Sequence, residues 1–288
     1  MKKIIFLFVF VIPVRSLSAQ ESGVFLKLPM SVRGAAMGDA FTALGDEPLG
    51  IYYNPAGIAF FKRPAVSFAH HIYLQDINGD SAGFVLPAGQ FVIGVAPTVF
   101  KMKEETLYDS FGNDTGRSFG YQSMVAPAAL AMRFGDLAVG VAAKYYSEKI
   151  DDLSTRTNAF DAGAVYRFNK LRFGFSSQNF GGKIYDYGLA KIQRIGVAYA
   201  GGALTVAADA VKEGTAGNYF NAGGEFSLLN LIKLRAGWRL RKDFGGPTFG
   251  LGFNLGNLMV DYAFVRYGDL GDTHKMGLSY GFGADKTK

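Results

Sequence analysis

The chain has 288 residues, of which 15% are aromatic and 38 are glycine, and it has no cysteine. Such a length suits one large β domain or two smaller globular domains. Without cysteine the fold must close by hydrogen bonding and packing rather than by disulfides. The formal net charge of +6 includes Lys2, Lys3 and Arg15, so removal of a leader that carries them leaves 6 − 3 = +3. With this small charge and no Lys/Arg-rich run, we expect no nucleic-acid partner.

The N-terminus has the pattern of a secretory signal peptide. Two lysines precede an apolar stretch from Ile4 to Val14, and the small residues Ser16, Ser18 and Ala19 follow it. The apolar part is shorter than the roughly 20 residues that a membrane-spanning helix needs. We predict a signal peptide at residues 1–19, cleaved after Ala19, with a retained N-terminal anchor as the alternative.

Residues 20–63 do not alternate like the rest of the chain. The small, apolar run 34–43 suits a short helix packed closely against other backbone. Residues 46–48, Asp-Glu-Pro, place acidic side chains and a proline where a helix start favours them. Pro55 can open a further short helix, which Gly57 can end. We therefore expect short helices in this segment.

From Pro64 to Phe282 the dominant pattern is alternation with a period of two, which is typical of a strand with two different faces. In residues 231–241 one face is apolar, with Ile232, Leu234, Ala236, Trp238 and Leu240, and the other carries Lys233, Arg235, Gly237, Arg239 and Arg241. Residues 159–168 and 257–267 show the same pattern. About fourteen such segments occur, each near the ten-residue length of a membrane strand.

The connections between these segments alternate in length. Short links are found at 89–90, 135–136, 169–170, 201–202, 229–230 and 256–257, and longer polar links at 102–117, 151–156, 180–190, 212–217, 242–246 and 268–273. Tight turns on one rim and longer loops on the other are typical of a bacterial outer-membrane barrel, and an even strand count puts both ends of the barrel on the periplasmic side.

Alternation alone also fits a soluble β-sandwich or propeller. The export signal, the alternating turn lengths and the tyrosines near the ends of the apolar faces favour the membrane barrel; these tyrosines are Tyr145, Tyr166, Tyr199, Tyr262 and Tyr280. Because charges facing lipid would cost a few kcal/mol each, the charged face must line the lumen. The predicted lumen charges, of mixed sign and suited to cross-strand pairing, are Asp161, Arg167, Arg172, Arg194, Asp209, Glu225, Lys233, Arg235, Arg239 and Asp261.

We therefore predict an all-β protein, a transmembrane antiparallel barrel at 64–282 with a tail at 283–288. Residues 20–63 would form a plug, or hatch, inside the lumen, because lipid cannot hold irregular backbone. The predicted partners include outer-membrane lipid, and the predicted location is the bacterial outer membrane.

The plug carries motifs that resemble a known family. Phe25-Leu26-Lys27, the run from Arg33 to Phe41 and Tyr53-Asn54-Pro55-Ala56-Gly57 look like the start of the PorV/PorQ family, within the wider FadL-like group of fourteen-stranded barrels with an N-terminal hatch. The resemblance implies a gating or binding role for these motif residues: Gly34, Met37, Gly38, Asp39, Phe41, Tyr53, Asn54, Pro55, Ala56 and Gly57.

The resemblance implies two functions. PorV-like members serve type IX protein secretion and engage exported cargo, so secreted proteins would be partners. FadL-like members admit long-chain fatty acids or other hydrophobic molecules and release them sideways through the wall after the hatch moves. We expect the secretion role first, with transport as the alternative and a purely structural envelope role as a third hypothesis.

No motif predicts catalysis, a cofactor or a metal site. Gly277-Leu278-Ser279-Tyr280-Gly281 matches G-x-S-x-G, but it lies in an alternating strand and no histidine follows it. Asp76-x-Asn78-x-Asp80 imitates the start of a calcium loop and lacks the later glycine and glutamate, so a hairpin tip is the simpler interpretation. The histidines are His70, His71 and His274. Adjacent residues of a strand point to opposite faces, so His70 and His71 cannot both bind one metal in the usual way.

Overall fold

The computed structural model describes residues 22–241 and 245–283. The predicted signal peptide at 1–19 lies outside these residues. No helix in the described part of the chain is long and apolar enough to cross a membrane.

The described strands form one antiparallel sheet that closes on itself, because the first strand pairs with both the second and the last. The strands of the barrel are β1 (Ala65–Ile72), β2 (Ile77–Ala88), β3 (Phe91–Val95), β4 (Thr98–Tyr108), β5 (Asp114–Phe134), β6 (Leu137–Ile150), β7 (Leu153–Phe168), β8 (Leu171–Phe180), β11 (Ile192–Gly201), β12 (Leu204–Glu213), β13 (Gly217–Leu228), β14 (Ile232–Leu240), β15 (Gly246–Leu255), β16 (Leu258–Arg266) and β17 (Asp272–Gly281). Since β3 and β4 are two halves of one strand, the wall has fourteen strands, which confirms the predicted fold class.

Side-chain alternation explains why these segments pair in this register. On β14 the side chains of Leu234, Trp238 and Leu240 are 45%, 52% and 58% exposed, whereas Arg235 and Arg239 between them are 4% and 7% exposed. Aromatic and aliphatic side chains cover the outer face in this way around the barrel. A one-residue slip would turn the charges into lipid, so the register is strongly specified.

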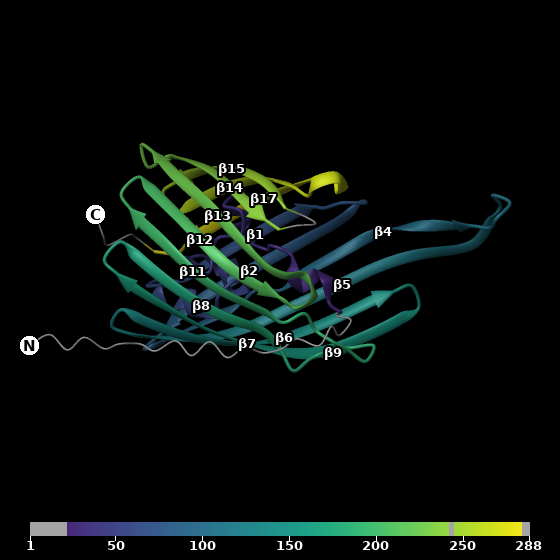
Figure 1. Ribbon diagram of the computed structural model, residues 1–288, viewed down its shortest axis with the longest axis horizontal. Coiled ribbons are helices and arrows are strands. Elements are labelled where there is room, and N and C mark those ends of the chain that lie inside the picture. The colour runs from purple at the N-terminus through teal and green to yellow at the C-terminus, as the bar shows by residue number, and fades with distance from the viewer. Residues whose placement is uncertain (1–21, 242–244, 284–288) are drawn as a thin grey trace, which may run out of the picture.

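The connections divide between two rims. The short-turn rim carries the links between β2 and β3, β5 and β6, β7 and β8, β11 and β12, β13 and β14, and β15 and β16. On the loop rim, the predicted link 102–117 is mostly strand, because β4 and β5 continue beyond the wall as a projecting hairpin (Figure 1). The predicted links 151–156 and 180–190 are also shorter than expected: β7 already starts at Leu153, and β9 (Lys183–Ile184) and β10 (Tyr187–Gly188) form a small hairpin.

Residues 22–63, called the N-terminal segment below, enter at the loop rim, where Ser22 pairs with Leu189, and run through the inside of the barrel (Figure 1). The segment contains η1 (Val24–Lys27), α1 (Val32–Ala36), η2 (Pro48–Tyr52) and η3 (Pro55–Phe60). Pro48 and Pro55 start their helices as predicted. The expected helix at 34–43 was wrong in extent, because α1 ends at Ala36, and Gly57 lies inside η3 rather than ending it. Short 3-10 turns at η4 (Gly214–Ala216) and η5 (Gly268–Leu270) complete the fold.

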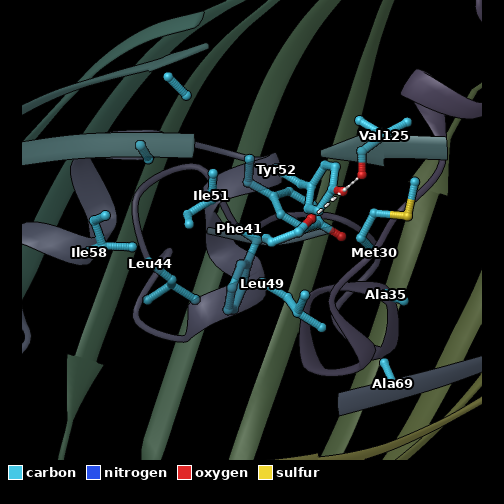
Figure 2. Close-up of a cluster of buried hydrophobic side chains, with 14 of the residues drawn as sticks. Met30, Ala35, Phe41, Leu44, Leu49, Ile51, Tyr52, Ile58, Ala69 and Val125 are labelled. Atoms are coloured by element: carbon cyan, nitrogen blue, oxygen red, sulfur yellow. Dashed lines mark hydrogen bonds between the residues drawn. The ribbon is translucent and has the colours of Figure 1, made fainter. Parts of the chain in front are cut away.

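The main hydrophobic core lies between this segment and the inner wall. Four side chains of the segment are fully buried and pack with inward-facing wall residues such as Val125 (Figure 2); they are Phe41, Leu44, Ile51 and Ile58. Inward-facing glycines let the segment's backbone approach the wall closely, because an added Cβ at each would meet segment atoms; they include Gly140, Gly174, Gly223, Gly237 and Gly250.

Candidate functional site

The third strand of the wall is interrupted at Ala96–Pro97, which we call the wall break. The register is the same on both sides of it: Val95 pairs with Ala128, and Thr98 with Val125. The interruption therefore comes from a residue that cannot donate a backbone hydrogen bond and not from a shift of pairing. Proline has no N–H to give to the ladder.

Two prolines remove ladder hydrogen bonds at this level. On one side, Ala82 donates its N–H to the Pro97 carbonyl at 2.9 Å, and Pro97 cannot donate in return. On the other side, Ala96 donates to the Pro127 carbonyl at 3.0 Å, and Pro127 cannot donate to the Ala96 carbonyl. The Ala96 carbonyl is thus left without its strand partner.

Tyr52 of the N-terminal segment takes the place of that missing donor. Its hydroxyl donates to the Ala96 carbonyl at 2.6 Å, and it lies 2.9 Å from Thr98 Oγ1 and 3.3 Å from the Val125 carbonyl oxygen (Figure 2). Gln178 of β8 donates to the Tyr52 carbonyl at 2.7 Å and fixes the backbone of the residue. The segment is therefore attached to the wall at the point where the two prolines interrupt its hydrogen bonds.

The predicted Tyr53-Asn54-Pro55-Ala56-Gly57 motif forms the bend that presents Tyr52. Asn54 is 0% exposed; its Oδ1 accepts from the Ala56 N–H, and its amide lies within 3.0 Å of the Thr42 and Ala164 carbonyl oxygens. The Tyr53 hydroxyl donates to Asp39 at 2.8 Å. An added Cβ at Gly57 would overlap the Gly45 backbone. The motif thus ties two turns of the segment to each other and to the wall.

The other predicted hatch residues anchor the first half of the segment. Gly34 leaves room for the Tyr53 hydroxyl, and Gly38 has a φ of 64° and donates to Thr248 Oγ1 at 3.0 Å. The Phe41 N–H donates to the Asp209 carboxylate at 3.0 Å, and Met37 is fully buried. These residues hold the segment in place, while their predicted gating role stays a prediction.

The ten predicted lumen charges all lie on inward-facing positions and are buried or half-buried. Several of them lie around Arg235, and Arg194 and Arg239 lie apart from these around a second cavity. Toward the short-turn rim, Arg235 bonds Glu225 and Asp261 at 2.6 Å each, and Arg33 bridges Glu225 at 2.8 Å to Asp46 at 2.7 Å. Three further cations lie close to this group. Lys233 donates to Ser227, and Arg172 binds Asp46 at 2.8 Å. The Arg167 guanidinium lies 3.3 Å from the centroid of the Phe60 ring. Asp161 pairs with Lys144 at 2.7 Å.

A cavity of about 300 Å³ opens above the segment toward the loop rim, and we call it the upper cavity. Its apolar lining includes Leu28, Pro29, Leu74, Ile77 and Leu270, and its polar lining includes Arg194, Arg239, Tyr219, Tyr267 and Asp39. Arg194 is 6% exposed, and its Nε and Nη1 have no hydrogen-bond partner in the described part of the chain. An apolar cavity with an unsatisfied guanidinium suits an amphiphile with an anionic head.

A second cavity of about 320 Å³, the lower cavity, lies near the short-turn rim among Arg33, Glu47, Glu225, Arg235 and Asp261. Its ion pairs make the axial way out of the barrel strongly polar. Burial raises the pKa of Glu47 to about 7, although a hydrogen bond from Ser31 and the Arg33 charge act in the opposite direction.

This raised pKa predicts a pH-dependent stability. A carboxyl whose folded pKa lies above its unfolded value near 4.5 contributes stability below pH 4.5 and loses it as the pH rises through about 7. Glu47→Gln should leave the free energy of unfolding unchanged at pH 4 and raise it on the order of 1–3 kcal/mol at pH 8. Urea unfolding of the refolded barrel at both pH values measures this. Glu105→Gln, on the projecting hairpin, is the control, and an equal effect of both variants would contradict the prediction.

On the outer face, an apolar groove of about 670 Å³ runs past the wall break, and we call it the outer groove. Outward side chains line it from both sides of the β1 and β17 seam, among them Phe68, Ala82, Pro97, Val99 and Leu278. Pro97 therefore borders the groove outside, while Tyr52 holds the neighbouring carbonyl from inside.

The remaining motifs lie apart from this site. His70 points outward and binds Asp80 at 2.8 Å, whereas His71 is buried in the lumen, so the two point to opposite faces as predicted. Ser279 lies within β17 and bonds Ser67 at 2.8 Å. No group of three or more His, Cys, Asp or Glu side chains in the described residues could hold a metal ion.

These features define a fourteen-stranded transmembrane barrel with a luminal N-terminal segment. A family model described as "Uncharacterised protein family (UPF0164)" matches residues 16–179, more than half of the chain, and the protein belongs to this family. No curated protein matches the chain.

Two solved structures share the fold. The Ralstonia pickettii toluene transporter TbuX is 14% identical with a TM-score of 0.67, over 88% of this chain and 98% of that one. The P. putida toluene transporter TodX is 11% identical with a TM-score of 0.62, over 89% of this chain and 99% of that one. At these identities the likeness establishes the fold alone.

Sequence reasoning missed Tyr52, Pro97 and Pro127. A proline inside a strand of a closed barrel was the available signal, since it must leave a neighbouring carbonyl without its donor. The partner of that carbonyl could not be read from the sequence, because Tyr52 lies 44 positions from Ala96.

Proposed function

We propose that the protein is an outer-membrane channel for hydrophobic small molecules and that it is not an enzyme. The observation that carries this proposal is the wall break, bordered outside by an apolar groove and held closed inside by Tyr52. A molecule that enters the upper cavity leaves sideways through the break once the N-terminal segment withdraws Tyr52. The ion pairs of the lower cavity oppose axial passage of an apolar molecule, since desolvating them is costly.

The upper cavity favours an amphiphile with one anionic group, such as a long-chain fatty acid. Its carboxylate would form a charge-assisted hydrogen bond with Arg194, two of whose nitrogens have no partner among the described residues, and its chain would lie against Leu28 and Ile77. Toluene is the molecule that TbuX and TodX carry by name; an uncharged ring of that kind would leave Arg194 unsatisfied here.

Uptake by vesicles that contain the refolded protein tests this proposal. A fluorescent long-chain fatty acid should enter such vesicles and not protein-free ones. Arg194→Gln should raise the half-saturating concentration at least about tenfold for the fatty acid, because a charge-assisted hydrogen bond is lost, and should leave the uptake of toluene unchanged. Arg156→Gln, an exposed rim variant, is the control. Equal uptake with and without protein would contradict the channel.

The resemblance to the PorV/PorQ family favours a second function, in type IX secretion. One structural observation supports it: the projecting β4–β5 hairpin exposes Tyr108 by 65% and Phe111 by 88%, which suits contact with another protein. Secretion of C-terminal-signal proteins that continues normally after deletion of the gene would exclude this function.

A further inference from the structure

Two side chains in the wall of the upper cavity each leave one polar atom without a partner. Asn221 of β13 and Arg239 of β14 lie directly opposite each other in the barrel, and both line the cavity. They are 2% and 7% exposed. Within the described part of the chain, neither Asn221 Oδ1 nor Arg239 Nε has a hydrogen-bond partner. Because buried polar atoms are nearly always hydrogen-bonded, the pair indicates a polar group of a bound ligand.

The bonds that these two side chains do make fix which atoms remain. Asn221 Nδ2 donates to the Asp39 carbonyl at 3.4 Å. Since a backbone carbonyl can only accept, the amide nitrogen must face it and Oδ1 must face away. Arg239 Nη2 donates to the Arg266 carbonyl at 2.6 Å, and the guanidinium lies 4.1 Å from the centroid of the Tyr267 ring. The remaining atoms are therefore one acceptor and one donor, on opposed residues whose Cβ atoms lie about 5 Å apart.

A hydroxyl group complements this acceptor and donor. It can donate to Asn221 Oδ1 and accept from Arg239 Nε at the same time. A carboxylate or an ether oxygen can only accept, so either would leave Asn221 Oδ1 without a donor. An ammonium can only donate, and it would be repelled by the Arg239 charge. Of these groups, the hydroxyl alone satisfies both atoms.

The pair lies close to Arg194, the residue that would bind the carboxylate of a fatty acid. Asp39 connects the two places. Asn221 donates to its carbonyl, and the Tyr53 hydroxyl donates to its carboxylate at 2.8 Å. The Arg194 guanidinium lies 5.6 Å from the centroid of the same Tyr53 ring. A hydroxyl group at Asn221 would therefore belong to the head of the ligand and not to the end of its chain.

We propose that Asn221 and Arg239 form a hydroxyl subsite, and that the preferred ligand is a fatty acid with a hydroxyl group on its second or third carbon. The inference rests on the proposed function, since Arg194 then holds the carboxylate. Such an acid satisfies all three side chains, whereas an unsubstituted acid leaves Asn221 Oδ1 without a donor. A site built to hydrogen-bond a hydroxyl group discriminates against the analogue that lacks it.

Displacement of a fluorescent long-chain fatty acid from the refolded protein in detergent tests the subsite. The competitors are hexadecanoic acid and its 2-hydroxy, 3-hydroxy and 3-methoxy derivatives, with the enantiomers of each hydroxy acid measured separately. One hydroxy acid should displace the probe at least about fivefold better than hexadecanoic acid, because two buried hydrogen bonds are gained. It should also act better than its mirror image, since Asn221 and Arg239 lie on one wall. Mirror images partition equally into micelles, so this difference comes from the protein. The methoxy acid cannot donate and should show no gain.

Variants assign the preference to the subsite. Asn221→Leu should remove the advantage of the hydroxy acid over hexadecanoic acid. Arg194→Gln should weaken the binding of all the acids and keep that advantage, because it changes only the carboxylate contact. Asn218→Leu, the same substitution at an exposed position of β13, is the control and should keep the advantage.

A wild-type protein that does not distinguish the hydroxy acids from hexadecanoic acid, or one enantiomer from the other, would overturn the subsite, whether or not Asn221→Leu folds. An undiminished preference in folded Asn221→Leu would do the same. Vesicle uptake of the same acids separates this result from the channel function. Uptake of hexadecanoic acid without a hydroxyl preference would remove the subsite and leave the channel, whereas selective binding without uptake would remove the channel and leave the subsite.

Discussion

Oxidation of the double variant Val32→Cys/Gly277→Cys is expected to reduce fatty-acid uptake at least about tenfold, and a reductant should restore it. The proposed exit opens only if the N-terminal segment moves away from the wall. A Cβ added at Gly277 lies 3.4 Å from the Val32 Cβ, close to the roughly 3.5–4.5 Å that a disulfide requires. The chain has no cysteine of its own, so no other thiol competes for the bond.

The position of this disulfide is chosen so that it locks movement and leaves the cavities intact. Val32 lies on α1 and Gly277 on β17, and neither lines the upper cavity. Each single-cysteine variant controls for the substitutions themselves and should transport normally under oxidising conditions. Uptake by the oxidised double variant at the wild-type rate would show that the segment need not leave the wall at α1.

Gly38→Ala is expected to lower the free energy of unfolding by about 2–5 kcal/mol. Gly38 has a φ of 64°, which costs a residue with a side chain about 1–2 kcal/mol. An added Cβ would also lie 2.6 Å from the Trp238 amide nitrogen and 2.7 Å from the Ala222 carbonyl oxygen. Both are backbone atoms of the wall and cannot rotate away, so overpacking adds roughly a further 1–3 kcal/mol.

Gly89→Ala separates these two contributions. Gly89 has a φ of 65° in the short turn between β2 and β3, and no atom lies within 4 Å of its added Cβ. It should therefore show the backbone cost alone. The midpoint of urea unfolding of the refolded barrel measures both variants, and equal losses would mean that Gly38 does not need the close approach to β14.

The wall could be predicted from the sequence because each strand carries its own two-faced pattern. On β14 the alternation of Trp238 with Arg239 can be seen in neighbouring residues. Because lipid lies outside every strand and the lumen inside it, apolar side chains face outward and charged side chains inward on each strand. The short helices at Pro48 and Pro55 could also be predicted from neighbouring residues, since proline favours the first position of a helix, where no N–H is needed.

The bounds of the N-terminal segment's helices were less predictable. The run 34–43 reads as one helix, yet α1 ends at Ala36, because Gly38 turns with a positive φ toward β14 and Phe41 bonds Asp209. Gly57 does not end η3. Its lack of a side chain instead allows the Gly45 backbone to approach closely, because an added Cβ would overlap that backbone. In both cases a tertiary contact decided what a glycine does.

The sequence by itself determined a β-barrel with charges inside and a distinct N-terminal segment, because periodicity and turn length are properties of neighbouring residues. Only the tertiary structure decided that Pro97 and Pro127 lie at one level of the wall and that Tyr52 supplies the donor they lack. Those contacts join residues far apart in the chain, and hydrogen bonding across a closed barrel depends on which strands the closure brings together.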